Sequence, residues 1–278
     1  MAGKSWSRSL RVVSAVASNS VPLIGVLRFQ WPAANLLFLF WAETFFGGIA
    51  QIIRIIIHRK LTHLRGHYRS HKDDAISRRI TGQPELKTTY LAEFCGTYIP
   101  FTLAHVFLLA VGLGVLRNEA GPGSGSQWYI QLHSLVQGTA IIAAVAFLEL
   151  AVELPFLANR SFASIRLRGD QFLGRILMLH MSLLGGIFLL VWFGQPIAFL
   201  AILVGLKLLW DLGYAFYGDK ANQLPEKTPG WIRALGRMTD FDADEAWKGI
   251  IREQEAELAA DERPVIPDQV TPVLGENA

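Results

Sequence analysis

The chain has 278 residues, of which 51% are hydrophobic and only 18% are charged, whereas charged residues make up about a quarter of soluble domains. This composition favours a protein that exposes much of its surface to lipid. Residues 219–278 contain seven Lys or Arg and thirteen Asp or Glu, so the net charge of +3 combines a basic body with an acidic tail. The single cysteine, Cys95, excludes an intrachain disulfide and a cysteine-based zinc site.

Six apolar segments have the length of a membrane-spanning helix, which takes about 20 residues. They are predicted at about residues 10–27, 31–57, 88–116 and 128–157, and on both sides of the turn Gly194–Pro196 within residues 174–218. The first segment is the least regular, because Pro22 bends or breaks a helix there. The sequence therefore predicts an all-α, polytopic membrane protein: a bundle of about six transmembrane helices followed by a cytoplasmic amphipathic tail.

Basic residues concentrate on one side of these predicted spans. Three lie in the N-terminal tail, eight between the second and third spans, and four between the fourth and fifth. The opposite side has only Arg28 and Arg117. Since cytoplasmic loops carry the excess of Lys and Arg, we predict a multi-pass protein of the cell membrane with both termini in the cytoplasm.

Two domains are predicted: a six-helix transmembrane domain, residues 1–218, and an acidic cytoplasmic tail, residues 219–278. In the tail, Asp242-Ala243-Asp244 predicts the start of an amphipathic helix that runs to about Ala260, because a capping carboxylate accepts hydrogen bonds from the first backbone N–H groups. Residues from Pro264 onward are expected to be disordered. The tail is a candidate surface for a protein partner.

Three stretches carry a resemblance to a known family: NSVPLIGVL with Trp41-Ala42-Glu43, FTLAHVFLL around His105, and GRILMLHMSLLGGIF with FGQPIAFLAILVGLKLLWDL. On these residues, about 19–212, the chain resembles an uncharacterised family of prokaryotic integral-membrane proteins, a domain of unknown function. The resemblance implies a shared helical fold. It makes five ionisable residues matching positions: Glu43, His105, His180, Lys207 and Asp211.

Ionisable residues inside the predicted spans form the candidate site, because charges in hydrocarbon are costly unless they face protein or water. The main candidates are Glu43, His180, Lys207 and Asp211, and the secondary candidates are His105, Arg54 and Arg175. Lys207 and Asp211 are one helical turn apart and can pair. Glu43 has no partner for its charge on its own helix, so it is neutral, hydrated or paired across helices. Depth estimates place His105 in the outer third of the membrane, away from Asp211.

The second predicted span has one polar face, formed by Glu43, Gly47, Gln51 and Arg54 at helical spacing. The pair Gly47-Gly48 is expected to admit a neighbouring backbone. Near the cytoplasmic boundary, Glu149 and Glu153 are expected to face the arginines between Arg160 and Arg175, which we place before the fifth helix.

Residues 58–87 form a basic loop that is expected to contact anionic lipid headgroups. Within it, His63, His67 and His71 recur every four residues beside His58, so a helical loop would bring imidazoles together for Zn²⁺ or Cu²⁺. The lipid interpretation is favoured, since no carboxylate lies between these histidines. No nucleic-acid partner and no cofactor are expected.

The leading functional hypothesis is proton- or ion-linked transport or permeation through the cluster of Glu43, His180, Lys207 and Asp211. The alternatives are a membrane-embedded enzyme or metal-binding protein, and a membrane scaffold that binds a partner through its tail. A carrier requires a hydrated path to the cluster, and an enzyme requires groups converging on one point. A scaffold requires only that the charges be paired. No H-E-x-x-H, G-x-S-x-G or Walker motif occurs in a usable context, so no catalytic residue is assigned.

Overall fold

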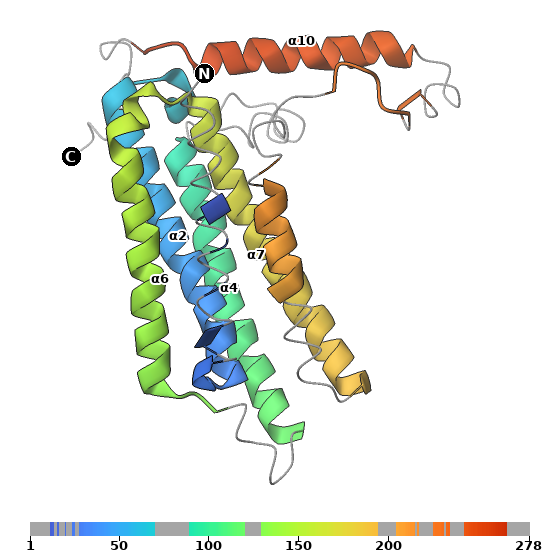
Figure 1. Cartoon of the computed structure of the whole chain (residues 1–278). Coiled ribbons are helices and arrows are strands. Elements are labelled where there is room, and N and C mark those ends of the chain that lie inside the picture. Colours follow the sequence, from blue (N-terminus) through green and yellow to red (C-terminus); the bar gives the residue numbers. More distant parts are fainter. Residues whose placement is uncertain are drawn as a thin grey trace, which may run out of the picture. The chain divides into compact units, whose positions relative to one another are not determined.

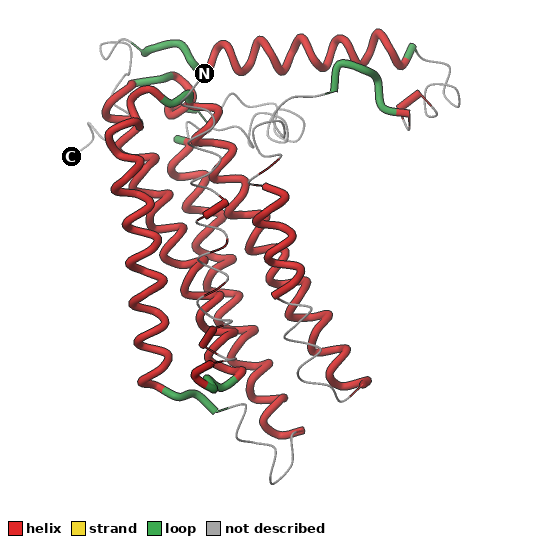
Figure 2. Tube along the Cα trace, viewed as in Figure 1, coloured by secondary structure: helices red, strands yellow, loops and turns green. Residues whose placement is uncertain are grey.

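The computed structural model describes residues 30–69, 89–119, 129–193, 204–214, 225–230 and 242–265, together with single positions between residues 12 and 29 and at 216, 232 and 233. Within these residues the regular structure is helical, with one isolated β-bridge and no strand (Figure 2). The predicted all-α class is confirmed.

The described helices follow one another in the order shown in Figure 1. They are α2 (Ala33–Thr62), η1 (Arg65–Tyr68), α4 (Tyr90–Glu119), α6 (Leu132–Glu153), η3 (Leu154–Asn159), α7 (Phe162–Phe193) and α10 (Ala243–Asp261), and residues 204–214 are also helical. The second, third and fourth predicted spans correspond to α2, α4 and α6 with η3. Most of the first predicted span, the loop 121–126 and the turn Gly194–Pro196 lie outside the described residues.

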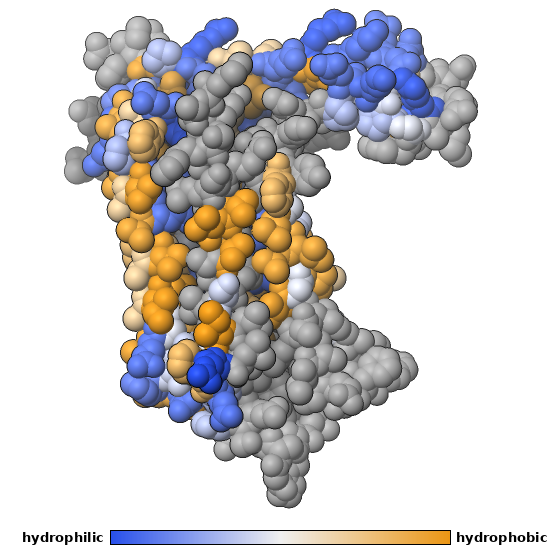
Figure 3. All heavy atoms as spheres, in the orientation of Figure 1, coloured by the Kyte–Doolittle hydropathy of each residue, from blue (hydrophilic) through white to orange (hydrophobic). Residues whose placement is uncertain are grey.

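Within the part of the chain that the structure describes, three helices are long and apolar enough to cross a membrane: Ala34–Thr62, Tyr90–Gly114 and Leu132–Asn159. Large apolar side chains on two of them point outward, among them Phe107 on α4, 68% exposed, and Leu132 on α6, 70% exposed. Figure 3 shows apolar residues gathered along the middle of the long helices. An apolar surface of this kind is compatible with contact to lipid.

Helix α7 begins twelve residues earlier than the predicted fifth helix, so the expectation that Arg166, Arg168 and Arg175 precede that helix is wrong. The backbone N–H of Ser164 donates to the hydroxyl of Ser161, which caps the helix start. Buried apolar positions then continue one helical face along α7: Phe162, Ile165, Phe172, Ile176 and Leu179.

The chain divides into two compact units, each described by itself below. The bundle unit contains Met1–Arg54, Phe94–Leu157 and Arg168–Gly218. The tail unit contains Ile55–Glu93, Ala158–Leu167 and Asp219–Ala278. The predicted domain boundary after residue 218 stays a prediction.

Helix α2 supplies most of the apolar core of the bundle unit. Its side chains pack with α4 and α7 in one cluster: Ala34, Leu36, Leu37, Phe40, Leu109, Leu113 and Leu179. The start of α2 is tied to the start of α6, because the Asn35 amide donates to the Gln131 carbonyl and accepts from the Gln131 N–H, at 2.9 and 3.1 Å. These contacts fix α2 as the helix against which the polar side chains of its neighbours are placed.

The pair Gly47-Gly48 receives aromatic rings instead of the neighbouring backbone that the sequence suggested. The Tyr98 ring lies over Gly48, where an added Cβ would come within 1.9 Å of it, and the Phe172 ring lies over Gly47. The Tyr98 hydroxyl donates to the Thr44 carbonyl at 2.6 Å. The absence of side chains at these glycines therefore lets α4 and α7 pack closely on α2.

In the tail unit, α10 starts as the sequence predicted. The Asp242 carboxylate accepts hydrogen bonds from the backbone N–H groups of Asp244 and Glu245. Hydrogen bonds from Thr228 and Arg233 lower the pKa of the Asp244 carboxyl, so this exposed group is ionised at neutral pH beside the positive end of the helix dipole. Trp247 on α10 packs against Ile232 and fixes the preceding segment to the helix.

Candidate functional site

Four charged side chains from three helices form a closed ring of ion pairs in the bundle unit, called the first ring below. Helix α2 supplies Glu43, α7 supplies Arg175, and the helical residues 204–214 supply Lys207 and Asp211. The Lys207 ammonium lies 2.9 Å from Glu43 and 3.0 Å from Asp211. The Arg175 guanidinium lies 2.7 Å from Asp211 and 3.3 Å from Glu43.

Each charge in the first ring therefore touches two charges of opposite sign, and the ring as a whole is neutral. Its side chains are shielded from solvent, with exposures of 7% for Glu43, 12% for Arg175, 2% for Lys207 and 1% for Asp211. In such surroundings an unbalanced charge costs several kcal/mol. The stability of the ring depends on keeping two cations against two anions.

Aromatic faces line the cationic half of the first ring. The Lys207 nitrogen lies 5.1 Å from the centre of the Phe40 ring, and the Arg175 guanidinium carbon lies 5.4 Å from the centre of the Phe172 ring. Both distances fall in the range of cation–π contacts. The cations are thus held in place by ring faces as well as by carboxylates.

A second ring of ion pairs lies further along α2 and α7. It contains Arg54 on α2, Glu149 and Glu153 on α6, and Arg168 on α7. Arg54 donates to Glu153 at 2.8 Å and lies 4.0 Å from Glu149, while Arg168 forms hydrogen bonds with both glutamates. The second ring is also neutral, with two arginines against two carboxylates.

The two rings share α2 and α7 because their residues recur on one face of each helix. Arg168 and Arg175 are seven residues apart, which is two helical turns or about 10 Å of rise. On α2, the fully buried Gln51 lies between Glu43 and Arg54. A polar seam therefore runs along both helices through an otherwise apolar bundle.

His180 makes its described contacts outside the first ring. Its Nδ1 lies 2.8 Å from the Ile176 carbonyl and 3.3 Å from Nδ1 of His105. Because a carbonyl oxygen only accepts, the His180 Nδ1 carries the hydrogen, which leaves this nitrogen unsuited to hold a metal. His180 was predicted to join Glu43, Lys207 and Asp211, yet its ring meets that of His105, which was predicted in the outer third of the membrane.

Several sequence-predicted residues are thus brought together. Glu43, Lys207 and Asp211 join one ring, Arg175 completes it, and Arg54 belongs to the second ring. Glu149 and Glu153 were expected to face the arginines between Arg160 and Arg175, but the sequence did not single out Arg168 and placed it before the fifth helix, whereas it lies within α7. The seven-residue spacing of Arg168 and Arg175, with Ser161 as a helix cap ahead of them, was a usable signal.

The described residues contain no group of three or more His, Cys, Asp or Glu side chains that could hold a metal ion. In the tail unit, His58 and His67 are both fully buried, with Nδ1 of His58 2.6 Å from Nε2 of His67. Tetrahedral zinc would hold two imidazole nitrogens about 3.3 Å apart, so this contact is a hydrogen bond. His63 has a left-handed backbone (φ 49°), which ends the helix and removes the shared face expected for the histidines, and His71 lies outside the described residues.

These observations define a class: an all-helical protein with helices that could cross a membrane and a buried, balanced charge network. The family model described as "Family of unknown function (DUF6498)" matches residues 1–228, and the chain belongs to this family. The predicted resemblance to an uncharacterised family is confirmed. Searches of curated proteins and of solved structures found no match.

Proposed function

We propose that the chain is an integral protein of the cell membrane, with both termini in the cytoplasm, that moves protons or small ions across the bilayer. The observation that carries this proposal is the first ring: two carboxylates and two cations buried within helices of an apolar bundle. Ionisable residues at such positions in membrane proteins commonly belong to proton or ion pathways.

Proton transport requires two charge states of the first ring. Protonating one carboxylate leaves Lys207 and Arg175 to share the other, and the two cations then repel each other. Both carboxylates contact both cations, and Glu43 is the more exposed of the two, so we assign it the exchangeable proton. Loss of its charge weakens the contacts of α2 with α7 and with residues 204–214, which gives proton binding a route to helix movement.

Stability alone is a weak explanation for the first ring. Four buried charges lose their hydration, and a well-packed apolar replacement is often as stable as a buried ion pair or more so. Ion pairs that rearrange during a transport cycle serve a purpose that apolar packing cannot serve. This comparison supports a functional part for the ring.

The second candidate is a membrane scaffold, and one observation favours it. Every member of the first ring has oppositely charged neighbours within 3.3 Å, as a purely structural lock requires. A cavity of about 480 Å³ among the described residues lies in the tail unit and has none of the ring residues in its lining. A scaffold predicts a dry ring, whereas a carrier predicts that water reaches it.

Water access to position 207 separates the two candidates. In a Cys95→Ser background, Lys207→Cys is combined with Asp211→Asn, so that Glu43 and Arg175 remain as a neutral pair. A water-soluble, membrane-impermeant thiol reagent is then applied to sealed vesicles, with Leu39→Cys, fully buried in the core, as the matched control. We expect modification at position 207 and none at position 39. Equal protection of both thiols would favour the scaffold.

A further inference from the structure

The acidic end of α10 is bound to basic side chains of the tail unit. Arg69 lies 2.6 Å from Glu257 and 2.7 Å from Asp261, and Arg166 lies 3.8 Å from Glu257. Asp261 is buried, with 1% of its side chain exposed, whereas the other members of this group are partly open to solvent. The end of α10 therefore occupies two arginines that could otherwise bind an external anion.

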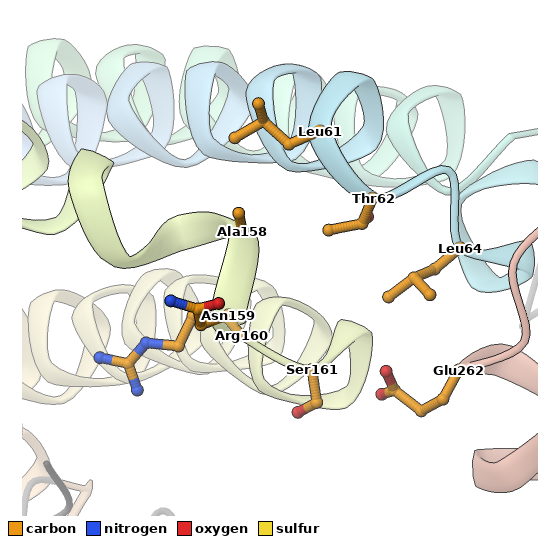
Figure 4. A pocket seen from close by; sticks show the side chains of 8 residues that line it. All are labelled: Leu61, Thr62, Leu64, Ala158, Asn159, Arg160, Ser161 and Glu262. Atoms are coloured by element: carbon orange, nitrogen blue, oxygen red, sulfur yellow. The ribbon is translucent and has the colours of Figure 1, made fainter.

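Glu262, the next residue, caps the first turn of α7. Its two carboxylate oxygens accept hydrogen bonds from the backbone N–H groups of Phe162 and Ala163, at 3.1 and 3.0 Å. The positive end of the α7 dipole strengthens these bonds. Glu262 also lines the cavity in Figure 4, where its side chain lies beside Ser161.

The chain beyond α10 then pairs with the segment after α2. The Arg65 N–H donates to the Arg263 carbonyl, and the Val265 N–H donates to the His63 carbonyl, both at 2.8 Å. Leu64 and Pro264 face each other between these two bonds as an antiparallel bridge. Residues 257–265 thus make backbone and side-chain contacts with two segments that are distant in the sequence.

The surface that receives residues 257–265 is held in place by its own contacts. The buried hydrogen bond between His58 and His67 ties η1 to α2. The Phe162 ring packs on His67 at 4.8 Å between ring centres and fits against Gly66, where an added Cβ would come within 2.2 Å of it. Because these contacts do not involve residues 257–265, the surface that receives these residues remains formed when they detach.

We propose that residues 257–265 are a releasable clasp, and that anionic lipid headgroups release it by competing with Glu257 and Asp261 for Arg69 and Arg166. The competition is possible because Arg69, Arg166 and Glu257 keep between 25% and 41% of their side chains exposed. Partly exposed ion pairs are weak and are screened by other charges. A membrane surface rich in anionic lipid attracts each nearby arginine by about 1 kcal/mol. This inference does not rest on ion movement through the first ring.

A disulfide between positions 64 and 264 reports the docked clasp. Residues that face each other in a non-hydrogen-bonded antiparallel pair have Cα atoms about 4.5 Å apart, which is suited to a disulfide. The full chain carrying Leu64→Cys, Pro264→Cys and Cys95→Ser is reconstituted in vesicles of phosphatidylcholine alone or of equal parts phosphatidylcholine and phosphatidylglycerol. The initial rate of oxidative cross-linking is measured in both.

We expect cross-linking in phosphatidylcholine and a rate about thirtyfold lower with phosphatidylglycerol, because two arginines at about 1 kcal/mol each add up to about 2 kcal/mol. Glu257→Gln with Asp261→Asn should lower the rate in both lipids. The matched control Glu255→Gln, on an exposed position of α10, should leave it unchanged. Equal rates in the two lipids, or no cross-link in either, would overturn the proposal.

Two further measurements separate the possible causes of a slower cross-linking rate. Free inorganic phosphate, added to phosphatidylcholine vesicles at constant ionic strength, should not slow cross-linking, and a slowing would assign the competing anion to solution instead of the membrane. Spin labels at Leu61→Cys and Ala259→Cys measure the same docking without altering the bridge. Their distance distribution should broaden in phosphatidylglycerol, and an unchanged distribution would count against the clasp.

Discussion

Glu43 is paired with two other side chains, and neither of them lies on its own helix. The nearest basic residue of the polar stripe on α2, Arg54, binds Glu153 in the second ring. Lys207 and Arg175 take its place as partners, from two other helices. If Glu43 were neutralised, Lys207 and Arg175 would lose one of the negative charges that balance them. Any change in the charge of Glu43 is therefore coupled to the positions of the helices that carry these two cations.

The two glutamates of the second ring should differ in importance. Glu153 bridges Arg54, at 2.8 Å, and Arg168, whereas Glu149 forms a hydrogen bond with Arg168 and lies 4.0 Å from Arg54. We therefore expect Glu153→Gln to destabilise the purified protein by about 3–5 kcal/mol and Glu149→Gln by less. Denaturant unfolding in detergent measures both. Equal losses would contradict the pairing described here.

At the level of helices, contact between α2 and α4 depends on the missing side chain at Gly48. We expect Gly48→Ala to cost about 1–3 kcal/mol, because the Tyr98 ring must move and its hydrogen bond to Thr44 is strained. The matched control is Gly96→Ala on α4, where an added Cβ meets nothing within 4 Å and helix propensity improves. Thermal unfolding in detergent gives both values. A neutral Gly48→Ala would show that the two helices are less closely packed.

The helices were predictable from sequence to the extent that their signals are local. Apolar length predicted α2, α4 and α6, and Asp242 predicted the start of α10. The start of α7 was missed because the helix was predicted to begin with the long apolar run after Gly174. Arginines at helical spacing ahead of that run looked like a loop, although Ser161 and Phe162 already carried the signals of a helix start.

For the whole molecule, the polar stripe of α2 was predictable, but the partners of its residues were not. Helical periodicity places Glu43, Gln51 and Arg54 on one face, and all three are buried. Which cation meets which carboxylate depends on the offset between helices, and no local pattern encodes that offset. His180 was predicted to belong to the first ring, and Arg175 takes its place. The reason is that α7 begins at Phe162 and not near Gly174.

The charge distribution predicts how the whole chain lies in a membrane. Reporter fusions at residues 2 and 278 should both report the cytoplasm, and an insertion in the loop 121–126 should report the opposite side. The excess of Lys and Arg on one side of the predicted spans is the physical reason. Termini on opposite sides would remove the first predicted span from the fold.

Ion flux through the purified protein tests the central claim most directly. The protein is reconstituted in sealed vesicles that contain a pH-sensitive dye, and an imposed potassium diffusion potential drives proton entry. The test variant is Glu43→Gln with Lys207→Met, which keeps the ring neutral through the Arg175–Asp211 pair and should leave the unfolding midpoint close to that of the wild type. Glu253→Gln, on an exposed position of α10, is the matched control. The account predicts proton entry above that of protein-free vesicles for the wild type and for Glu253→Gln, and none above it for the folded double variant. Undiminished proton entry in that variant, or a wild type with no proton entry above that of protein-free vesicles, would contradict it.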